Sequence, residues 1–84
     1  MIPKKLYKIG EVMRYSQLSR QTIHNYTMLG LITEEERTDS GHRLYDESVF
    51  SRLERVKRLR ATKTLKEIRR ILDQENTDRG VRAP

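Results

Sequence analysis

The sequence predicts a small, mainly helical fold of about four helices with one two-stranded β-hairpin. Residues 18–26 are expected to include a short helix that Ser19 opens and whose side chains are mostly polar. Residues 40–45 follow as a glycine-turned basic segment, which is typical of a hairpin. Thr64 and Glu67 have the spacing of a capping box that starts a last helix. A polar helix followed by a basic hairpin is the arrangement of a winged helix-turn-helix, in which the hairpin is the wing.

The first two helices are predicted by apolar spacing and by a cap. Ile9, Val12 and Met13 recur at i, i+3 and i+4, which indicates a first helix of about two turns. Ser19 is a favourable N-cap for a second helix that runs to about Met28. We therefore expect two short helices joined by a turn.

The hairpin is predicted from strand-forming and turn-forming residues. Gly30 suits a left-handed cap after the second helix. Residues 31–33 and 42–45 are expected to be the two strands of the wing, and residues 39–41 supply its turn.

Two further helices complete the predicted domain. Asp46 is expected to cap the third helix, and the capping box at Thr64 the fourth. Because apolar periodicity ends after the fourth helix, we expect one domain over residues 7–72, a flexible N-terminus over residues 1–6 and a flexible tail over residues 73–84. The apolar positions that would line the core are Val49, Phe50, Leu53, Val56 and Leu59 in the third helix and Leu65, Ile68, Ile71 and Leu72 in the fourth.

Composition excludes several classes of protein. The chain has 84 residues, which is enough for one small domain, and no cysteine, which fits a reducing compartment. No apolar run approaches 18 residues, and no apolar core follows the charged N-terminus, so we expect neither a membrane span nor a signal peptide. With two histidines and no carboxylate pair spaced for acid–base chemistry, we expect no enzyme, no cofactor and no metal site. The expected location is the cytoplasm, in association with the nucleoid.

Charge is unevenly placed along the chain. The net charge is +6, and residues 51–70 hold nine basic and two acidic side chains. A polarised basic surface favours a polyanion partner, because binding releases condensed counterions. The alternative is that these cations only keep the protein in solution, but solvated faces usually mix both signs. Double-stranded DNA is therefore the expected partner.

The second helix carries the candidate base-reading residues. In a helix-turn-helix this helix enters the DNA major groove with its N-terminal residues nearest the bases. Arg20, Gln21 and His24 fall on that surface, and Arg reads guanine while Gln reads adenine. Asn25 is a further candidate reader of adenine.

Three other side chains at this helix are candidate phosphate ligands rather than base readers. Ser19 and Thr22 are expected to bond phosphates, helped by the positive end of the helix, although Ser19 would serve equally as a cap. Tyr26 is a candidate phosphate ligand, and a half-buried core ring is the favoured interpretation.

The wing and the last turn supply further candidates. Side chains alternate along a strand, so Leu44 is expected to seal the core while Arg43 and Tyr45 face the duplex. Arg37 is a second wing cation on the opposite strand. Lys63 and Thr64, at the start of the last helix, make a further candidate phosphate site.

The order of these motifs resembles the MerR family of bacterial transcription regulators over about 66 of the 84 residues. The resemblance implies a winged helix-turn-helix that binds double-stranded DNA in a sequence-specific way, with Arg43 as the wing arginine that grips phosphate. The motifs that carry it are Tyr7-Lys-Ile-Gly-Glu-Val12, Leu18-Ser19, Thr22-Ile23, Tyr26, Leu29-Gly-Leu-Ile32, Ser40-Gly-His-Arg-Leu-Tyr45 and Leu65-Lys-Glu-Ile68.

The chain departs from the family pattern at several positions. The family's second helix usually reads Thr-Ile-Arg-Tyr-Tyr-Glu, and here His24 and Asn25 replace the Arg and the first Tyr. His24 keeps a donor but not a permanent charge, since histidine, unlike arginine, is not always protonated. Residues 61–64 lack the Gly and the aromatic residue usual in that turn. Gln17 stands where the family often has Gly, and it can adopt a left-handed backbone only at some cost.

The resemblance also implies features that lie outside this sequence. The family's regulators continue with a long helix that pairs two protomers as a coiled coil, and RNA polymerase is a partner expected only of a full-length regulator. We expect the chain given to be a monomer, and a homodimer only with a further dimerisation segment. It is either an excised DNA-binding domain or a naturally minimal protein.

Two other functions remain open at this point. An excisionase-like or architectural protein that bends DNA would use the same fold. A membrane-surface or protein-interaction module would use the basic face of residues 51–70, but it would not explain the polar helix and the wing.

Overall fold

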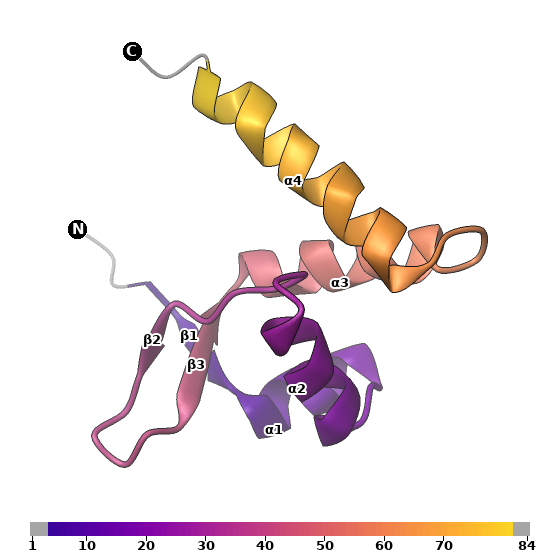
Figure 1. The fold of residues 1–84 in the computed structure, drawn as a ribbon. Coiled ribbons are helices and arrows are strands. Elements are labelled where there is room, and N and C mark those ends of the chain that lie inside the picture. Colours follow the sequence, from indigo (N-terminus) through magenta and orange to yellow (C-terminus); the bar gives the residue numbers. More distant parts are fainter. Residues whose placement is uncertain (1–3, 82–84) are drawn as a thin grey trace.

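The computed structural model describes the backbone of residues 4–81 and the side chains of residues 4–75. This part of the chain forms four helices and a three-stranded antiparallel sheet, which confirms the predicted fold class. In Figure 1, helices α1 to α3 gather beside the small sheet, while α4 starts past the end of α3 and runs back above it. In chain order the elements are β1 (Leu6–Lys8), α1 (Ile9–Ser16), α2 (Arg20–Met28), β2 (Glu36–Arg37), β3 (Arg43–Asp46), α3 (Ser48–Leu59) and α4 (Leu65–Val81).

The sheet has the order β1-β3-β2, so the wing strands β2 and β3 are joined by a strand from the N-terminus. Tyr7 of β1 lies opposite Tyr45 of β3. Lys4 lies just before β1 and forms an ion pair with Glu35, with 3.0 Å between Nζ and Oε2. The flexible segment expected over residues 1–6 is therefore ordered from Lys4 onward, and residues 1–3 lie outside the described residues.

The first wing strand was predicted at the wrong place. Residues 31–33 are not a strand, and pairing with β3 occurs instead at Glu36–Arg37. Leu31 and Ile32 are buried core residues whose backbone N–H groups donate to the carbonyl of Tyr26, at 2.9 and 3.4 Å. Because these donors close the C-terminal end of α2, they cannot enter a strand ladder.

The predicted turns and caps around α1 and α2 are confirmed. Gln17 has φ 61°, the left-handed conformation that costs a residue with a side chain about 1–2 kcal/mol. The Ser19 side chain accepts a hydrogen bond from the Thr22 N–H at 3.1 Å and caps α2. Gly30 has φ 79° and continues the chain past α2.

Side chains also cap α3 and α4 as predicted. Asp46 Oδ1 accepts from the Ser48 N–H at 3.0 Å. Thr64 and Glu67 form a reciprocal capping box, with the Thr64 N–H donating to Glu67 Oε1 at 2.8 Å.

Helix α4 runs further than the sequence indicated. It continues to Val81, through most of the segment 73–84 that we expected to be a tail, and residues 82–84 lie outside the described residues. An ion pair between Arg69 and Asp73, with 3.4 Å between Nε and Oδ2, spans one helical turn. Arg55 of α3 pairs with Glu75 of α4. Such pairs support a helix without an apolar stripe, which is why periodicity alone ended it too early.

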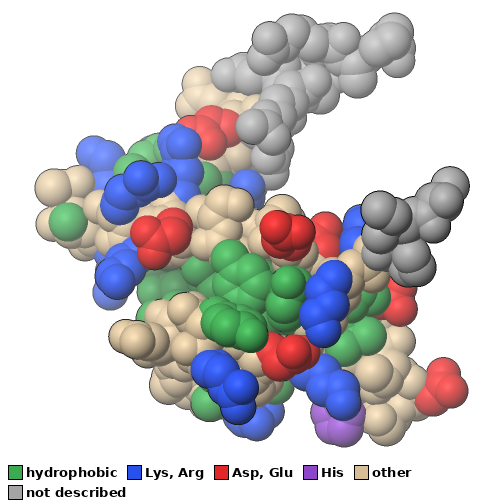
Figure 2. All heavy atoms as spheres, turned by 180° about the vertical axis from the view of Figure 1, so that it is seen from behind, with side chains coloured by type: hydrophobic (Ala, Val, Ile, Leu, Met, Phe, Trp, Pro, Cys, Tyr) green, Lys and Arg blue, Asp and Glu red, His purple; other side chains and the backbone are tan. Residues whose placement is uncertain are grey.

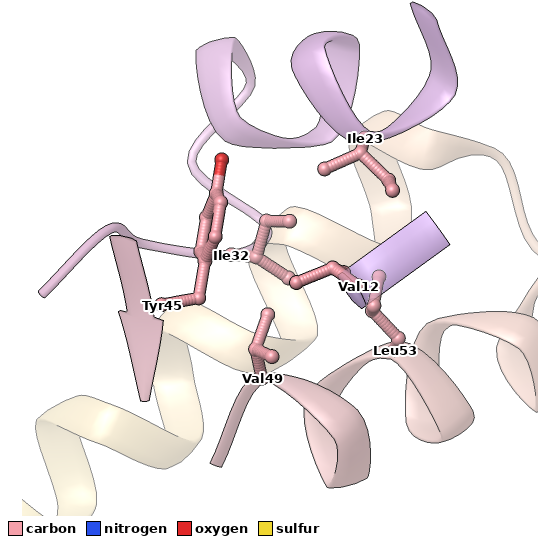
Figure 3. Close-up of a cluster of buried hydrophobic side chains, with 6 residues drawn as sticks. All are labelled: Val12, Ile23, Ile32, Tyr45, Val49 and Leu53. Carbon is pink, nitrogen blue, oxygen red and sulfur yellow. The ribbon is translucent and has the colours of Figure 1, made fainter. Parts of the chain in front are cut away.

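Two clusters of buried side chains hold these elements. The first, drawn in Figure 3, joins α1, α2, the sheet and α3, and consists of Val12, Ile23, Ile32, Tyr45, Val49 and Leu53. The second fixes α4 on α3 and consists of Leu31, Val56, Ile68 and Leu72. Tyr26 is half-buried and packs against both clusters, which confirms the favoured interpretation of this ring as a core residue. No described helix is long and apolar enough to cross a membrane.

Candidate nucleic-acid interface

Helix α2 presents a polar row to solvent because its apolar side is used by the core. Ile23 is fully buried in the first cluster (Figure 3). Arg20, Gln21, His24 and Asn25 are all exposed. The structure therefore brings together, on one helix, the four side chains that the sequence assigned to base reading.

Two of these exposed side chains are bonded to each other. Gln21 Nε2 donates to Asn25 Oδ1 at 3.0 Å, one helical turn apart. The pair leaves the Gln21 oxygen and the Asn25 amide protons available. An amide that offers both a donor and an acceptor is suited to the N6 and N7 edge of adenine.

The N-terminal hydroxyls of α2 are also ordered before any ligand arrives. Ser19 Oγ donates to Thr22 Oγ1 at 2.9 Å while accepting from the Thr22 N–H. Ser19 thus uses its proton in the cap, and Thr22 keeps its own hydroxyl proton. Of the two hydroxyls, Thr22 is the better placed to donate to a phosphate.

The wing tip is a turn bonded to itself. Thr38 N–H donates to the His42 carbonyl at 2.9 Å, and Gly41 N–H donates to the Thr38 carbonyl at 2.9 Å. Gly41 has φ 89°, a conformation open to glycine, which confirms the turn predicted over residues 39–41. The tip presents Ser40 and His42, whose Oγ and Nδ1 lie 3.1 Å apart.

Tyr45 faces the core, and its predicted place beside the duplex is wrong. The ring is fully buried in the first cluster, whereas Leu44 is only half-buried. The Tyr45 hydroxyl lies 2.8 Å from Thr27 Oγ1, so the buried phenol has the partner it requires. Tyr45 rather than Leu44 is therefore the core residue of this strand. Its burial is possible because Thr27, outside the strand, supplies a hydrogen-bond partner for its hydroxyl group.

A basic groove of about 710 Å³ lies between α1, the start of α2 and the wing tip. Lys8 and Arg14 line it together with Arg20 and Arg43. Glu11 also lines it, but its carboxylate accepts the Lys8 N–H at 3.0 Å, and this hydrogen bond lowers the pKa of Glu11. Sequence reasoning missed Lys8 and Arg14, because the pairing of β1 with β3 places Lys8 at the groove and the packing of α1 against α2 and β3 places Arg14 there.

The two wing arginines share one carboxylate. Arg43 Nε donates to Glu34 Oε1 at 2.8 Å. Arg37 donates to both Glu34 oxygens, through Nε to Oε2 and through Nη2 to Oε1 at 3.3 Å. The hydrogen bond from Arg37, followed by that from Arg43, lowers the pKa of Glu34 against the opposing effect of desolvation. Neither arginine is therefore the free wing cation that the sequence suggested.

The turn before α4 offers a weaker site. Lys63 and Thr64 are exposed there. The Thr64 N–H and Oγ1 are both engaged by Glu67, whose carboxylate occupies the helix end that a phosphate would use. The basic segment 51–70 is also less uniform than its composition suggested, since Arg52 Nε donates to the Leu31 carbonyl at 2.8 Å.

The face opposite that of Figure 1 is mixed in character. Figure 2 shows apolar side chains at its centre, with basic and acidic groups interspersed around them. Tyr7, Tyr15 and Phe50 contact one another edge to face, with ring centroids 4.9 to 6.4 Å apart. This arrangement contrasts with the groove between α2 and the wing, where cations predominate.

A short turn between two helices, a polar second helix and a basic hairpin beside it define a winged helix-turn-helix DNA-binding domain. Residues 8–45 match the family described as MerR family regulatory protein. The chain belongs to this family, and the described part of it is the family's DNA-binding domain.

Known proteins of this kind resemble the chain in sequence and in fold. It is 37% identical over 71 residues to the nodulation protein NolA of Bradyrhizobium sp. (strain NC92), covering 83% of the chain and 30% of NolA. It is 37% identical over 73 residues to the mercuric resistance operon regulatory protein of Bacillus cereus, covering 86% of the chain and 55% of that relative. The crystal structure of MtaN, the N-terminus of the Bacillus subtilis multidrug transporter activator, superposes with a TM-score of 0.75 at 31% identity, covering 80% of this chain and 64% of MtaN.

The comparisons bear on two further expectations. Several relatives are named as regulatory proteins or transcriptional activators, which supports a DNA-binding rather than an enzymatic domain. The chain spans 30 to 55% of the length of the first curated relatives, so it corresponds to one part of such a regulator.

Proposed function

We propose that this domain binds double-stranded DNA in a sequence-specific way, with α2 in the major groove and the wing on phosphates. The observation that carries the proposal is the exposed polar row of α2 beside the basic groove. An inserted helix reads base edges, while flanking cations hold the backbone. Arg20 lies at the junction, since it starts α2 and also lines the groove.

Each side chain has an assigned role in this proposal. Arg20 reads guanine, and the bonded pair of Gln21 and Asn25 reads adenine. His24 contacts a base edge or phosphate through one ring nitrogen. Thr22 donates to a phosphate at the positive end of α2.

The remaining contacts hold the DNA backbone. Arg43 grips a phosphate from the wing, and the groove cations Lys8 and Arg14 extend this contact toward α1. Lys63 adds an exposed charge at the turn before α4, where its partner Thr64 is already engaged by Glu67.

In a full-length regulator we propose that this domain controls transcription as one half of a homodimer. Each domain would then read one half-site, and the wider assembly would act at a promoter with RNA polymerase in the cytoplasm. Helix α4 supports this arrangement, since it continues to Val81 and points away from the domain in Figure 1.

Selection of bound sequences from a random duplex library tests the proposal. A chain fused after α4 to a coiled coil should enrich a palindrome, and its affinity should fall steeply with salt because phosphate contacts release counterions. Fusion should tighten binding to the palindrome by roughly 10²–10⁴ when the spacing is met. Enrichment of no sequence, together with salt-insensitive binding, would contradict the proposal.

A further inference from the structure

Glu34 lies at the centre of the wing's charge arrangement. It stands between α2 and β2, and its side chain is 22% exposed. Arg37 and Arg43 lie opposite each other in the register of β2 and β3, so one carboxylate reaches both guanidinium groups. Two cations and one anion at this point leave a net charge of about one unit.

The carboxylate treats the two arginines differently. It engages Arg37 along the whole edge formed by Nε and Nη2. It engages Arg43 through Nε alone, and no partner of either Nη group is found among the described residues. A fork-shaped pair of hydrogen bonds is the stronger and more specific arrangement, and a phosphate would use the same edge of Arg37.

Arg37 and Arg43 also differ in where they lie relative to the basic groove. Arg43 lines the basic groove between α2 and the wing tip, whereas Arg37 is absent from its lining. The Arg37 side chain is 53% exposed and that of Arg43 is 26% exposed. Exposure alone would thus indicate that Arg37 is the more available cation for a phosphate. The hydrogen bonds to Glu34 indicate instead that Arg43 is more available, because its Nη groups are not engaged by Glu34.

Resting on the proposed DNA binding, we propose that Glu34 withholds Arg37 from the DNA backbone while it orients Arg43 for a single phosphate. Glu34 is thereby a positioning residue that limits the sequence-independent part of the affinity. Phosphate contacts add affinity for every sequence alike, so one fewer contact leaves a larger share of binding to the base-reading residues of α2.

The test compares the salt dependence of binding for matched variants. Glu34→Gln keeps the shape of the side chain and one oxygen that can accept the single hydrogen bond from Arg43 Nε, but it removes the charge and the second acceptor that hold Arg37 at Nε and Nη2. Its slope of log K against log salt should become steeper by about 0.9, the increment for one added phosphate contact, and the ratio of specific to random-duplex affinity should fall. Glu36→Gln is the control, because it removes the same charge from the same wing and no partner of Glu36 is found among the described residues.

Arg37→Ala supplies a second, independent arm. Because Arg37 makes no phosphate contact in the proposed arrangement, its loss should leave the slope unchanged, whereas Arg43→Ala should reduce it by about 1. The double variant Glu34→Gln with Arg37→Ala should also show no steepening.

Three results would overturn the role of Glu34. They are an unchanged or shallower slope in Glu34→Gln, an equal steepening in Glu36→Gln, and a reduced slope in Arg37→Ala. In each of these the unaltered domain still binds DNA with a preferred sequence, so the proposed function would stand. Absence of salt-dependent duplex binding in the unaltered domain would overturn both proposals.

Discussion

The hydrogen bond between Tyr45 and Thr27 links strand β3 of the wing to helix α2, and its contribution to stability can be measured. Thr27 Oγ1 donates to the Ile23 carbonyl at 2.9 Å, so its proton is used and the Tyr45 hydroxyl must be the donor in the 2.8 Å contact. The tyrosine is fully buried and the threonine is half-buried. The two single variants therefore leave different groups without a partner.

The two substitutions should differ in cost for this reason. Tyr45→Phe removes the donor and leaves a half-buried oxygen that water can reach, so it should lower the free energy of unfolding by about 0.5–1.5 kcal/mol. Thr27→Val leaves a fully buried phenol without an acceptor, which should cost about 1–3 kcal/mol. In a domain of this size, 1 kcal/mol corresponds to a shift in Tm of roughly 4–8 °C.

Chemical unfolding of both single variants and of the double variant completes the test. The double variant should be more stable than the sum of the single changes predicts, because after the first change the second no longer breaks this contact. The difference should be about 0.5–1.5 kcal/mol, with the preferred DNA sequence unchanged. Additive losses across these chemical unfolding curves, followed by circular dichroism, would refute the direct link between β3 and α2.

Three further predictions concern other parts of the domain. Arg20→Ala should cost about 1–3 kcal/mol of binding and relax preference at one base pair, whereas Arg43→Ala should weaken all sequences alike; library selection and salt titration would show a reversal of these roles. Gln17→Gly should raise the free energy of unfolding by up to about 1 kcal/mol, measured in urea, because glycine adopts the left-handed conformation without the steric cost; a loss would contradict it. The hydrogen bond from Ser48 lowers the pKa of Asp46 below its unfolded value, so its stabilisation is present above about pH 4 and is lost as pH falls further; Asp46→Asn should flatten this part of the stability curve against pH, and an unchanged curve would exclude the contribution.

Much of the fold follows from local sequence signals. Ser19, Gly30, Asp46 and the Thr64 capping box each act within a few residues, and each was placed correctly. The exposed row of α2 also follows from helical spacing once Ile23 is taken as the buried residue.

Features that depend on distant partners could not be predicted in this way. The burial of Tyr45 depends on Thr27, and strand β1 depends on pairing with β3, which lies far along the chain. The state of the wing arginines depends on Glu34, and no local pattern of the sequence indicates that this carboxylate contacts both of them. Apolar periodicity indicates which side chains are buried, but it carries no information about which charged side chains form ion pairs.

The position of the C-terminal end of α4 depends on how its first turns pack against α3. This helix has 17 residues and so measures about 25 Å. Among the side chains that the structure describes, Ile68 and Leu72 in the first turns of α4 belong to the second cluster, and Glu75, further along, pairs with Arg55 of α3. Val81 lies about 13 Å beyond Leu72, so a tilt of about 10° at that cluster would move it by roughly 2 Å. Repacking of a single side chain such as Val56 would therefore change the angle between α4 and α3. The position of the C-terminal end of α4 would shift while α2 stays in place.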